Sequence, residues 1–333
     1  MAFFLSLKNK TFYLCYNNIG DKMDKIRIMF MGTPVFAEEI LQHLHNLNYN
    51  VVATVSQPDR RVGRKKVKKQ TPVRKLSDKL NIDCLQPEKI KNAQKEIFSY
   101  KPDLIITCAY GQIVPKDVLD FPKYGSFNIH ASLLPKLRGG APIHKAIMYQ
   151  EEKTGITIME MSKKMDAGDM VLKKEMPISN EHTTDTLTLD LIQMAKNAME
   201  EALPHIIAQD YEAEKQDESL VTYAYNVSKK EEFISFDRDY DTVDSHIRSL
   251  ISKPVGYGIV DGKKIKIHKC KRSEIASNAE NGEILGMIEG GIGVAVDNKV
   301  LILEKVQMEN KKAMTAKDFM NGAGQKLIGK KFD

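Results

Sequence analysis

The 333-residue sequence contains no tryptophan and only four cysteines, which lie far apart. These cysteines form no Cys-x-x-Cys pair and no Cys/His set at zinc spacing, so we expect neither a disulfide framework nor a metal site. No apolar run approaches the roughly 18–20 residues of a membrane span. The absences together favour a protein of the reducing cytoplasm that does not bind a membrane.

The sequence also lacks the Gly-x-Gly-x-x-Gly pattern of dinucleotide-binding proteins. The first apolar run, residues 26–31, ends in Gly32, Thr33 and Pro34, and no acidic residue is placed for a ribose. Dinucleotide binding is therefore poorly supported, although the surrounding pattern resembles that class of fold.

The content of apolar residues, 42%, and of charged residues, 28%, is ordinary for a globular protein with a real core. The length predicts two domains. Met23 stands just before the first expected strand, so we interpret residues 1–23 as an extension of unknown role. It lacks the cleavage pattern of a secretory signal.

Apolar runs and helical spacing alternate through the first half of the chain, which predicts strand, helix, strand units. Strands are expected at 26–31, 51–55, 104–109, 127–130, 154–161 and 170–177, and helices at 36–47, 89–100 and 186–207. Runs buried on both faces indicate a Rossmann-like, mostly parallel sheet of the α/β class. We assign this catalytic domain to residues 24–208.

The pattern changes after a polar segment, residues 209–224, which we interpret as a linker. One helix is expected at 241–250. Short strands divided by Gly, Asp and Asn turns follow it, at 259–261, 265–268, 284–288, 293–296 and 301–306. This pattern predicts a small OB-like β-barrel over residues 225–333, a type often used as a binding module.

One stretch, residues 57–72, holds seven basic residues and one acidic residue. It lies between two prolines and is longer than an ordinary strand-to-helix connection, so we expect a functional loop. A cationic loop of this kind suits phosphate contacts. The alternative is a solvated loop without a ligand, and the net charge of +6 alone does not decide between them.

Three residues are candidates for catalysis: Asn128, His130 and, further along the chain, Asp166. Asn128 and His130 are two apart and point to the same side of a strand. Asn offers a neutral donor for an oxyanion, His moves a proton near neutral pH, and Asp can orient the imidazole and stabilise its charged form. An attacking amine would need no covalent nucleophile. Taken singly, each residue also has a structural explanation.

The chain resembles the formyltransferase family, and in its basic loop and second domain the branch that acts on tRNA. The shared motifs lie at 32–37, 57–60, 109–111, 128–135, 138–142, 165–170, 217–224 and 311–314. They occur in the expected order from about Lys25 to near the C-terminus.

The resemblance implies transfer of a formyl group from 10-formyltetrahydrofolate to the α-amino group of methionine on initiator tRNA. It makes His130 the proton acceptor, Asn128 the hydrogen-bond donor that holds the oxyanion, and Asp166 the residue that orients the histidine. Two further groups of site residues follow from it. Folate contacts fall on Ser132, Leu133, Leu134 and Pro135, and tRNA contacts on Arg60, Arg61, Arg64, Lys65 and Lys66.

Other functions fit part of the sequence. A formyltransferase for a small amine, such as a sugar nucleotide, would not need the basic loop or the second domain. A tRNA-binding module without catalysis would not need Asn128, His130 and Asp166. A hydrolase that releases formate would need no amine acceptor. We expect a monomer that binds initiator methionyl-tRNA and the folate cosubstrate.

Overall fold

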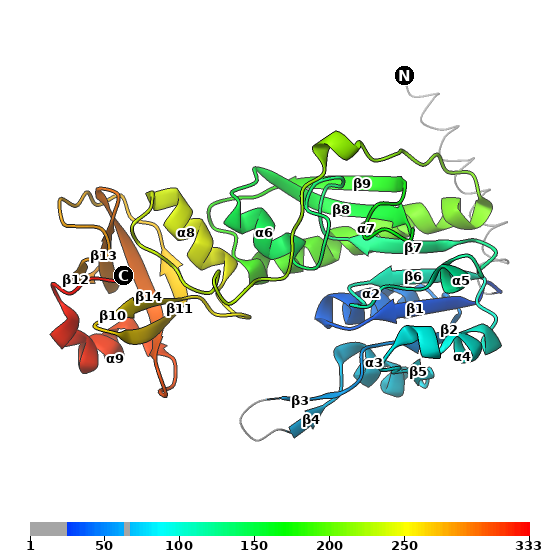
Figure 1. The fold of residues 1–333 in the computed structure, drawn as a ribbon, viewed down its shortest axis with the longest axis horizontal. Coiled ribbons are helices and arrows are strands. Elements are labelled where there is room, and N and C mark those ends of the chain that lie inside the picture. Colours follow the sequence, from blue (N-terminus) through cyan, green and yellow to red (C-terminus); the bar gives the residue numbers. More distant parts are fainter. Residues whose placement is uncertain (1–24, 63–66) are drawn as a thin grey trace. The chain divides into compact units, whose positions relative to one another are not determined.

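The computed structural model describes residues 25–62 and 67–333 (Figure 1). The predicted extension 1–23 lies outside the described residues. The chain forms two compact units, and each is built from three separate stretches of the sequence. The first contains the chain up to Gly140, Gly155–Glu175 and Asp190–Tyr223; the second contains Ala141–Thr154, Met176–Leu189 and Ala224–Asp333.

A seven-stranded sheet, in the order β5-β2-β1-β6-β7-β8-β9, forms the centre of the first unit. Its strands are β1 (Ile28–Gly32), β2 (Val51–Val55), β5 (Cys84–Leu85), β6 (Leu104–Cys108), β7 (Ser126–His130), β8 (Lys153–Glu160) and β9 (Met170–Pro177). The first five pair in parallel, and β8 runs antiparallel to β7. The predicted Rossmann-like, mostly parallel sheet is confirmed.

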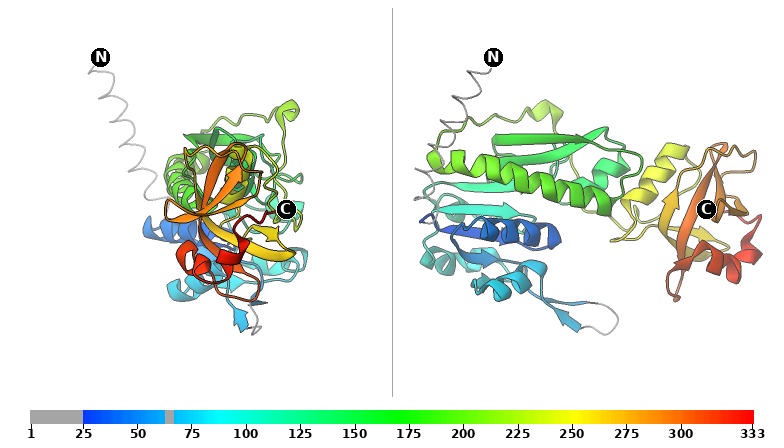
Figure 2. Two further views of the ribbon diagram at one scale, coloured as in Figure 1. Left: turned by 90° about the vertical axis from the view of Figure 1, so that its left-hand side faces the viewer. Right: turned by 180° about the vertical axis from the view of Figure 1, so that it is seen from behind.

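Helices cover both faces of this sheet, which explains why every residue of β1 and β6 is buried. Figure 2 shows α2 (Val35–Asn46) and α7 (Thr184–Ala208) on one face. The Nζ atom of Lys196 on α7 lies 2.7 Å from Oε2 of Glu39 on α2. Short helices α4 (Gln94–Ser99) and α5 (Lys116–Leu119) cover the other face, where Ile97 and Val118 join the core.

Two local predictions were wrong. The helix expected over 89–100 is divided into a 3-10 turn, Ile90–Asn92, and α4, because the N–H groups of Asn92 and Ala93 donate to the carbonyls three residues before them, Lys89 O and Ile90 O. The stretch expected as a loop forms a hairpin from β3 (Arg60–Val62) and β4 (Val67–Lys69), since their backbones pair with each other. Helix α3 (Pro72–Leu80), capped by the Thr71 hydroxyl, follows it.

The second unit is built on an antiparallel sheet in the order β10-β11-β14-β13-β12. Its strands are β10 (Tyr257–Val260), β11 (Lys263–Lys271), β12 (Ile284–Ile288), β13 (Gly291–Val296), β14 (Lys299–Met308) and β15 (Met314–Thr315), which pairs with β14. Residues near the C-terminus bond to both edge strands: the Ile284 N–H of β12 donates to Lys330 O, and the Asp333 N–H donates to Ile259 O of β10. The predicted C-terminal domain of short antiparallel strands is confirmed.

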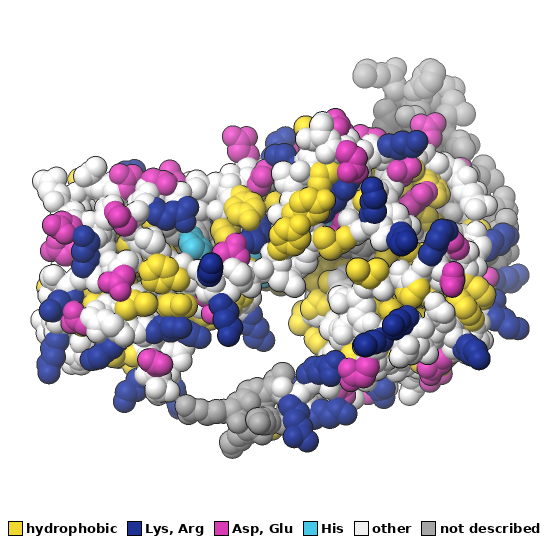
Figure 3. All heavy atoms as spheres, in the orientation of Figure 1, with side chains coloured by type: hydrophobic (Ala, Val, Ile, Leu, Met, Phe, Trp, Pro, Cys, Tyr) yellow, Lys and Arg dark blue, Asp and Glu magenta, His cyan; other side chains and the backbone are white. Residues whose placement is uncertain are grey.

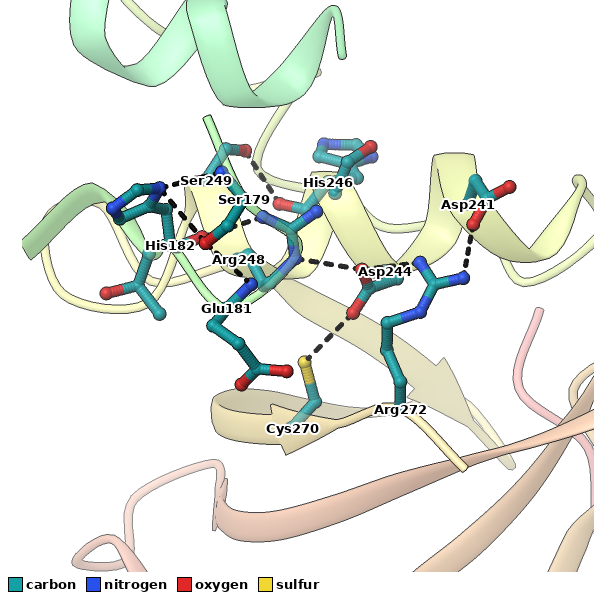
Figure 4. Close-up of polar contacts among 12 residues, drawn as sticks. Ser179, Glu181, His182, Asp241, Asp244, His246, Arg248, Ser249, Cys270 and Arg272 are labelled. Carbon is teal, nitrogen blue, oxygen red and sulfur yellow. Dashed lines mark hydrogen bonds and ion pairs between the residues drawn. The ribbon is translucent and has the colours of Figure 1, made fainter. Parts of the chain in front are cut away.

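Helix α8 (Tyr240–Ser249) is fastened in this unit by the buried carboxylate of Asp244 (Figure 4). It accepts from Arg248 Nε at 2.8 Å and from Arg272 Nη1 at 3.2 Å. Arg248 also donates to the carbonyl of His182, just before α7, at 2.7 Å. The pairing of a buried carboxylate with two guanidinium groups compensates for its removal from water. The remaining helices are α6 (Pro142–Met148), α9 (Ala316–Met320) and 3-10 turns at Glu218–Leu220 and Ala323–Leu327.

Over the described residues, no helix has the length and apolar character needed to cross a membrane.

Candidate active site

Strand β7 carries the first two predicted catalytic residues. Asn128 and His130 lie two apart at its carboxyl end, between parallel β6 and antiparallel β8. Ligands of open α/β sheets bind beyond this end of the strands. Backbone pairing sets Asn128 opposite Thr107 of β6, and His130 opposite Thr157 of β8.

The His130 ring is buried and held by a backbone carbonyl. Its Nε2 atom lies 3.0 Å from Leu137 O. A carbonyl oxygen can only accept, so Nε2 carries the hydrogen and Nδ1 of the neutral ring is the basic nitrogen. Nδ1 lies 3.8 Å from Asp166 Oδ2, a distance that suits an ion pair with the protonated ring and leaves Nδ1 without a direct hydrogen bond. Leu137 therefore orients the ring, a task the sequence analysis gave to Asp166.

Asp166 lies in a turn between β8 and β9 and has a left-handed backbone, with φ of 48°. Its two carboxylate oxygens accept from different groups. Oδ2 accepts from the Gly139 N–H at 2.9 Å, and Oδ1 accepts from Asn128 Nδ2 at 3.3 Å. Asn128 and His130 thus both lie beside the Asp166 carboxylate, as expected for three residues that act together.

Asn128 is fixed from the other side by Thr107, whose hydroxyl donates to Asn128 Oδ1 at 2.8 Å. The Asp166 carboxylate can only accept, so the amide atom that faces it is Nδ2, and Oδ1 is left to accept from Thr107. Nδ2 has two hydrogens, and only one is directed to Asp166. The second is available for an oxyanion.

In the predicted folate-binding segment, residues 132–135, two side chains are buried and two are partly exposed. Leu134 is buried against Met159 and Met170, and the Ser132 hydroxyl donates to Lys136 O at 2.7 Å. Leu133 and Pro135 are half-exposed. Of the four side chains, these two present apolar surface that a bound ring can cover.

Lys and Arg side chains gather on the β3–β4 hairpin (Figure 3). Of the predicted tRNA contacts, Arg60 and Arg61 lie exposed on β3, whereas Arg64, Lys65 and Lys66 lie outside the described residues. Both terminal nitrogens of the Arg60 guanidinium donate to Glu88, at 3.1 and 2.7 Å. Arg61 and its cross-strand neighbour Lys68 extend the basic surface.

In the parts of the chain that the structure describes, no three His, Cys, Asp or Glu residues are grouped to hold a metal ion.

Known proteins match almost the whole chain. Residues 24–203 match the family described as formyl transferase, and residues 226–324 match the formyl transferase C-terminal domain. The methionyl-tRNA formyltransferase of Bacillus licheniformis is 44% identical over 301 residues, which cover 90% of this chain and 95% of that protein. That of Bacillus subtilis is 43% identical over 300 residues, covering 89% and 95%. The chain belongs to the methionyl-tRNA formyltransferases.

Solved structures of more distant proteins share the fold. HypX from Aquifex aeolicus, in complex with tetrahydrofolic acid, has a TM-score of 0.67 at 17% identity, covering 91% of this chain and 48% of that one. The sugar 3N-formyl transferase WlaRD has a TM-score of 0.62 at 20% identity, covering 86% and 99%. At 17% and 20% sequence identity, the similarity to HypX and WlaRD shows only that they share this fold.

Three groups of the candidate site in this methionyl-tRNA formyltransferase were missed by the sequence analysis: the Thr107 hydroxyl, the Leu137 carbonyl and the Gly139 N–H. Thr107 had a detectable signal, because it is a polar residue in the otherwise apolar run 104–109. The two backbone groups leave no trace in the pattern of side chains, and only the folded chain brings them to His130 and Asp166.

Proposed function

We propose that the protein transfers the formyl group of 10-formyltetrahydrofolate to the α-amino group of methionine on initiator tRNA, and that Asn128, His130 and Asp166 carry out the transfer. Membership of the methionyl-tRNA formyltransferases supports the reaction. The observation that carries the residue assignment is the geometry of His130: Nε2 is committed to Leu137 O, and Nδ1 lies 3.8 Å from the Asp166 carboxylate.

In the proposed chemistry His130 accepts a proton and later returns it, while Asn128 and Asp166 stabilise the charges that form. The amine nitrogen forms a bond to the formyl carbon and passes a proton to Nδ1 of His130. The carbonyl oxygen becomes an oxyanion, which the free hydrogen of Asn128 Nδ2 stabilises. The bond from the formyl carbon to the folate nitrogen then breaks, and that nitrogen takes a proton from the imidazolium. Asp166 stabilises the imidazolium between these steps.

The rest of the chain supplies binding. We assign catalysis to residues 24–208, the connection to 209–224 and a tRNA-binding domain to 225–333. Leu133 and Pro135 would contact the folate through their half-exposed surfaces. The exposed basic side chains of Arg60 and Arg61, on the β3–β4 hairpin, would contact tRNA phosphates.

A labelled formyl group tests the reaction. Radiolabelled 10-formyltetrahydrofolate would be offered together with initiator methionyl-tRNA, uncharged tRNA, free methionine or an amino sugar nucleotide. We expect label only on the charged tRNA. Label on a free amine would indicate a small-amine formyltransferase, and label released as formate without any acceptor would indicate a hydrolase.

A variant tests the residue assignment. His130→Ala should abolish transfer while tRNA affinity stays near that of the wild type, because the imidazole moves a proton and does not bind the tRNA. His205→Ala is the matched control, since His205 is exposed and pairs with Asp210 at 3.0 Å. Transfer by His130→Ala within tenfold of the wild type would remove His130 from the mechanism.

A further inference from the structure

The segment after α7, predicted as a linker, is bonded to the active-site loops. Gln216 makes three hydrogen bonds there. Its Nε2 atom donates to Asp166 O at 2.9 Å and to Gly168 O at 2.8 Å. Its Oε1 atom accepts from Arg138 Nε at 2.9 Å. Both polar atoms of the Gln216 amide are therefore bonded, the nitrogen to the Asp166 turn and the oxygen to Arg138.

Arg138 belongs to the short stretch that holds both catalytic side chains. Leu137, before it, accepts from His130, and Gly139, after it, donates to Asp166. The Arg138 side chain is buried, and its Nη2 atom donates to Glu218 Oε1 at 2.9 Å. The Arg138 N–H donates to Thr222 O at 2.9 Å. Residues 216–222 thus hold this stretch at its side chain and at its backbone.

The Asp166 turn is held on two sides. Its left-handed backbone is one that Asp adopts more readily than most residues with a side chain, so hydrogen bonds to the turn decide how firmly it is placed. The turn also has no room to shift toward β8, because a Cβ built on Gly168 would lie 1.8 Å from Glu160 O. Gln216 binds the carbonyl groups of Asp166 and Gly168, on either side of Ala167, and so fixes the direction of the Asp166 carboxylate.

We propose that Gln216 is a positioning residue for formyl transfer: its amide bridges Arg138 and the Asp166 turn and so holds the Asp166 carboxylate toward His130 and Asn128. This proposal rests on the proposed function of those three residues. Gln216 acts through Asp166 and touches neither substrate.

Two substitutions of Gln216 test it. Gln216→Glu keeps an acceptor for Arg138 but has no hydrogen to donate to the two carbonyls. Gln216→Met keeps the length of the side chain, introduces no charge and removes all three bonds. Gln193→Glu is the matched control, because Gln193 is exposed on α7, where its amide donates to Asn197 Oδ1 at 3.0 Å.

We expect both Gln216 variants to lose about 10- to 100-fold in kcat, since displacement of a catalytic group by about 1 Å costs on the order of 100-fold. KM for tRNA and for the folate should stay within about twofold. Loss of the bond to the buried Arg138 should also lower the thermal midpoint, so kcat is measured per active site and well below the midpoint, beside Gln193→Glu. A purely structural role would leave kcat per active site unchanged and lower only the midpoint and the active fraction.

Three outcomes would overturn the proposal. One is wild-type kcat in both variants. The second is a raised KM with kcat unchanged, which indicates substrate binding. The third is an active Gln216→Glu beside an inactive Gln216→Met, which indicates that only the bond to Arg138 matters. Parallel measurement of His130→Ala separates the two proposals: if that variant keeps its activity, the proposed function fails, whatever the Gln216 variants do.

Discussion

The Thr107 hydroxyl donates a hydrogen bond to Asn128 Oδ1 at 2.8 Å, across the boundary between β6 and β7. Thr107 is buried, so water does not replace this donor when the hydroxyl is removed. The bond leaves the Asn128 nitrogen on the side of Asp166.

Thr107→Val should therefore slow formyl transfer. The substitution keeps the shape and removes the donor, which costs about 0.5–1.5 kcal/mol and lets the Asn128 amide rotate. We expect kcat to fall roughly 3- to 10-fold with little change in KM. Thr107→Ser, which restores the hydroxyl, should recover most of the rate. A Thr107→Val enzyme as fast as the wild type would show that Asn128 needs no help from β6.

Gly168→Ala should displace the Asp166 turn. The added Cβ would lie 1.8 Å from the Glu160 carbonyl oxygen, which belongs to β8 and cannot yield easily. We expect kcat to fall at least about 10-fold because the Asp166 carboxylate moves away from His130. Gly322→Ala is the control, since its nearest atoms would lie 3.9 Å away. Steady-state kinetics of the two variants, with thermal melting, makes the comparison.

The two arginines of β3 should contribute unequally to tRNA binding. The Arg60 guanidinium is held by both oxygens of Glu88, whereas Arg61 forms no salt bridge with another described residue. Arg61→Ala should weaken binding and lower the slope of log affinity against log salt by about 1. Arg60→Ala should lower the slope less, and Lys95→Ala, at an exposed position on α4, should leave it unchanged. Equal slopes for the two arginine variants would contradict this ranking.

The second unit should lose stability in acid through Glu231. Burial favours the neutral carboxyl, but hydrogen bonds from Lys145 and Ser228 outweigh it and lower the pKa of Glu231 from 4.5 to about 2. A lowered folded-state pKa means that the stabilisation is complete above about pH 4.5 and is lost as the pH falls from there through 2.

Glu231→Gln should cost about 3 kcal/mol at pH 7, because it leaves the buried ammonium of Lys145 without its counter-charge. Urea denaturation at pH 7 and at pH 3 measures both effects. The difference between wild type and variant should shrink at the lower pH. A difference that stays constant would show that the Lys145–Glu231 pair does not set the acid limit.

The sequence predicted the strands of the first sheet well because their signal is local. Burial on both faces makes β1 and β6 continuous apolar runs, which are legible without any partner. Asn128, His130 and Asp166 could be proposed as site residues for a different reason, since their side chains are chemically distinctive. The basic hairpin was missed because charge hides the pairing of two three-residue strands.

The supports of the site could not be predicted in the same way. Leu137 and Gly139 act through backbone groups that every residue possesses, and Gln216 is 50 residues from Asp166 in the sequence. Such contacts depend on the tertiary fold, and the polar composition of residues 209–224 is equally compatible with a free linker and with a bonded strap.

The bonded segment from Gln216 to Thr222 also decides where the protein can be cut. A fragment ending at Ala208, where α7 ends, would contain Asn128, His130 and Asp166 and would look complete by its motifs. It would nevertheless leave Arg138 Nε and the backbone N–H groups of Leu137 and Arg138 without their acceptors on Gln216 and Thr222. We therefore expect a fragment that keeps formyl-transfer activity to extend past α7 and to include Gln216 and Thr222. Domain boundaries for such fragments are better chosen from these hydrogen bonds than from the sequence motifs.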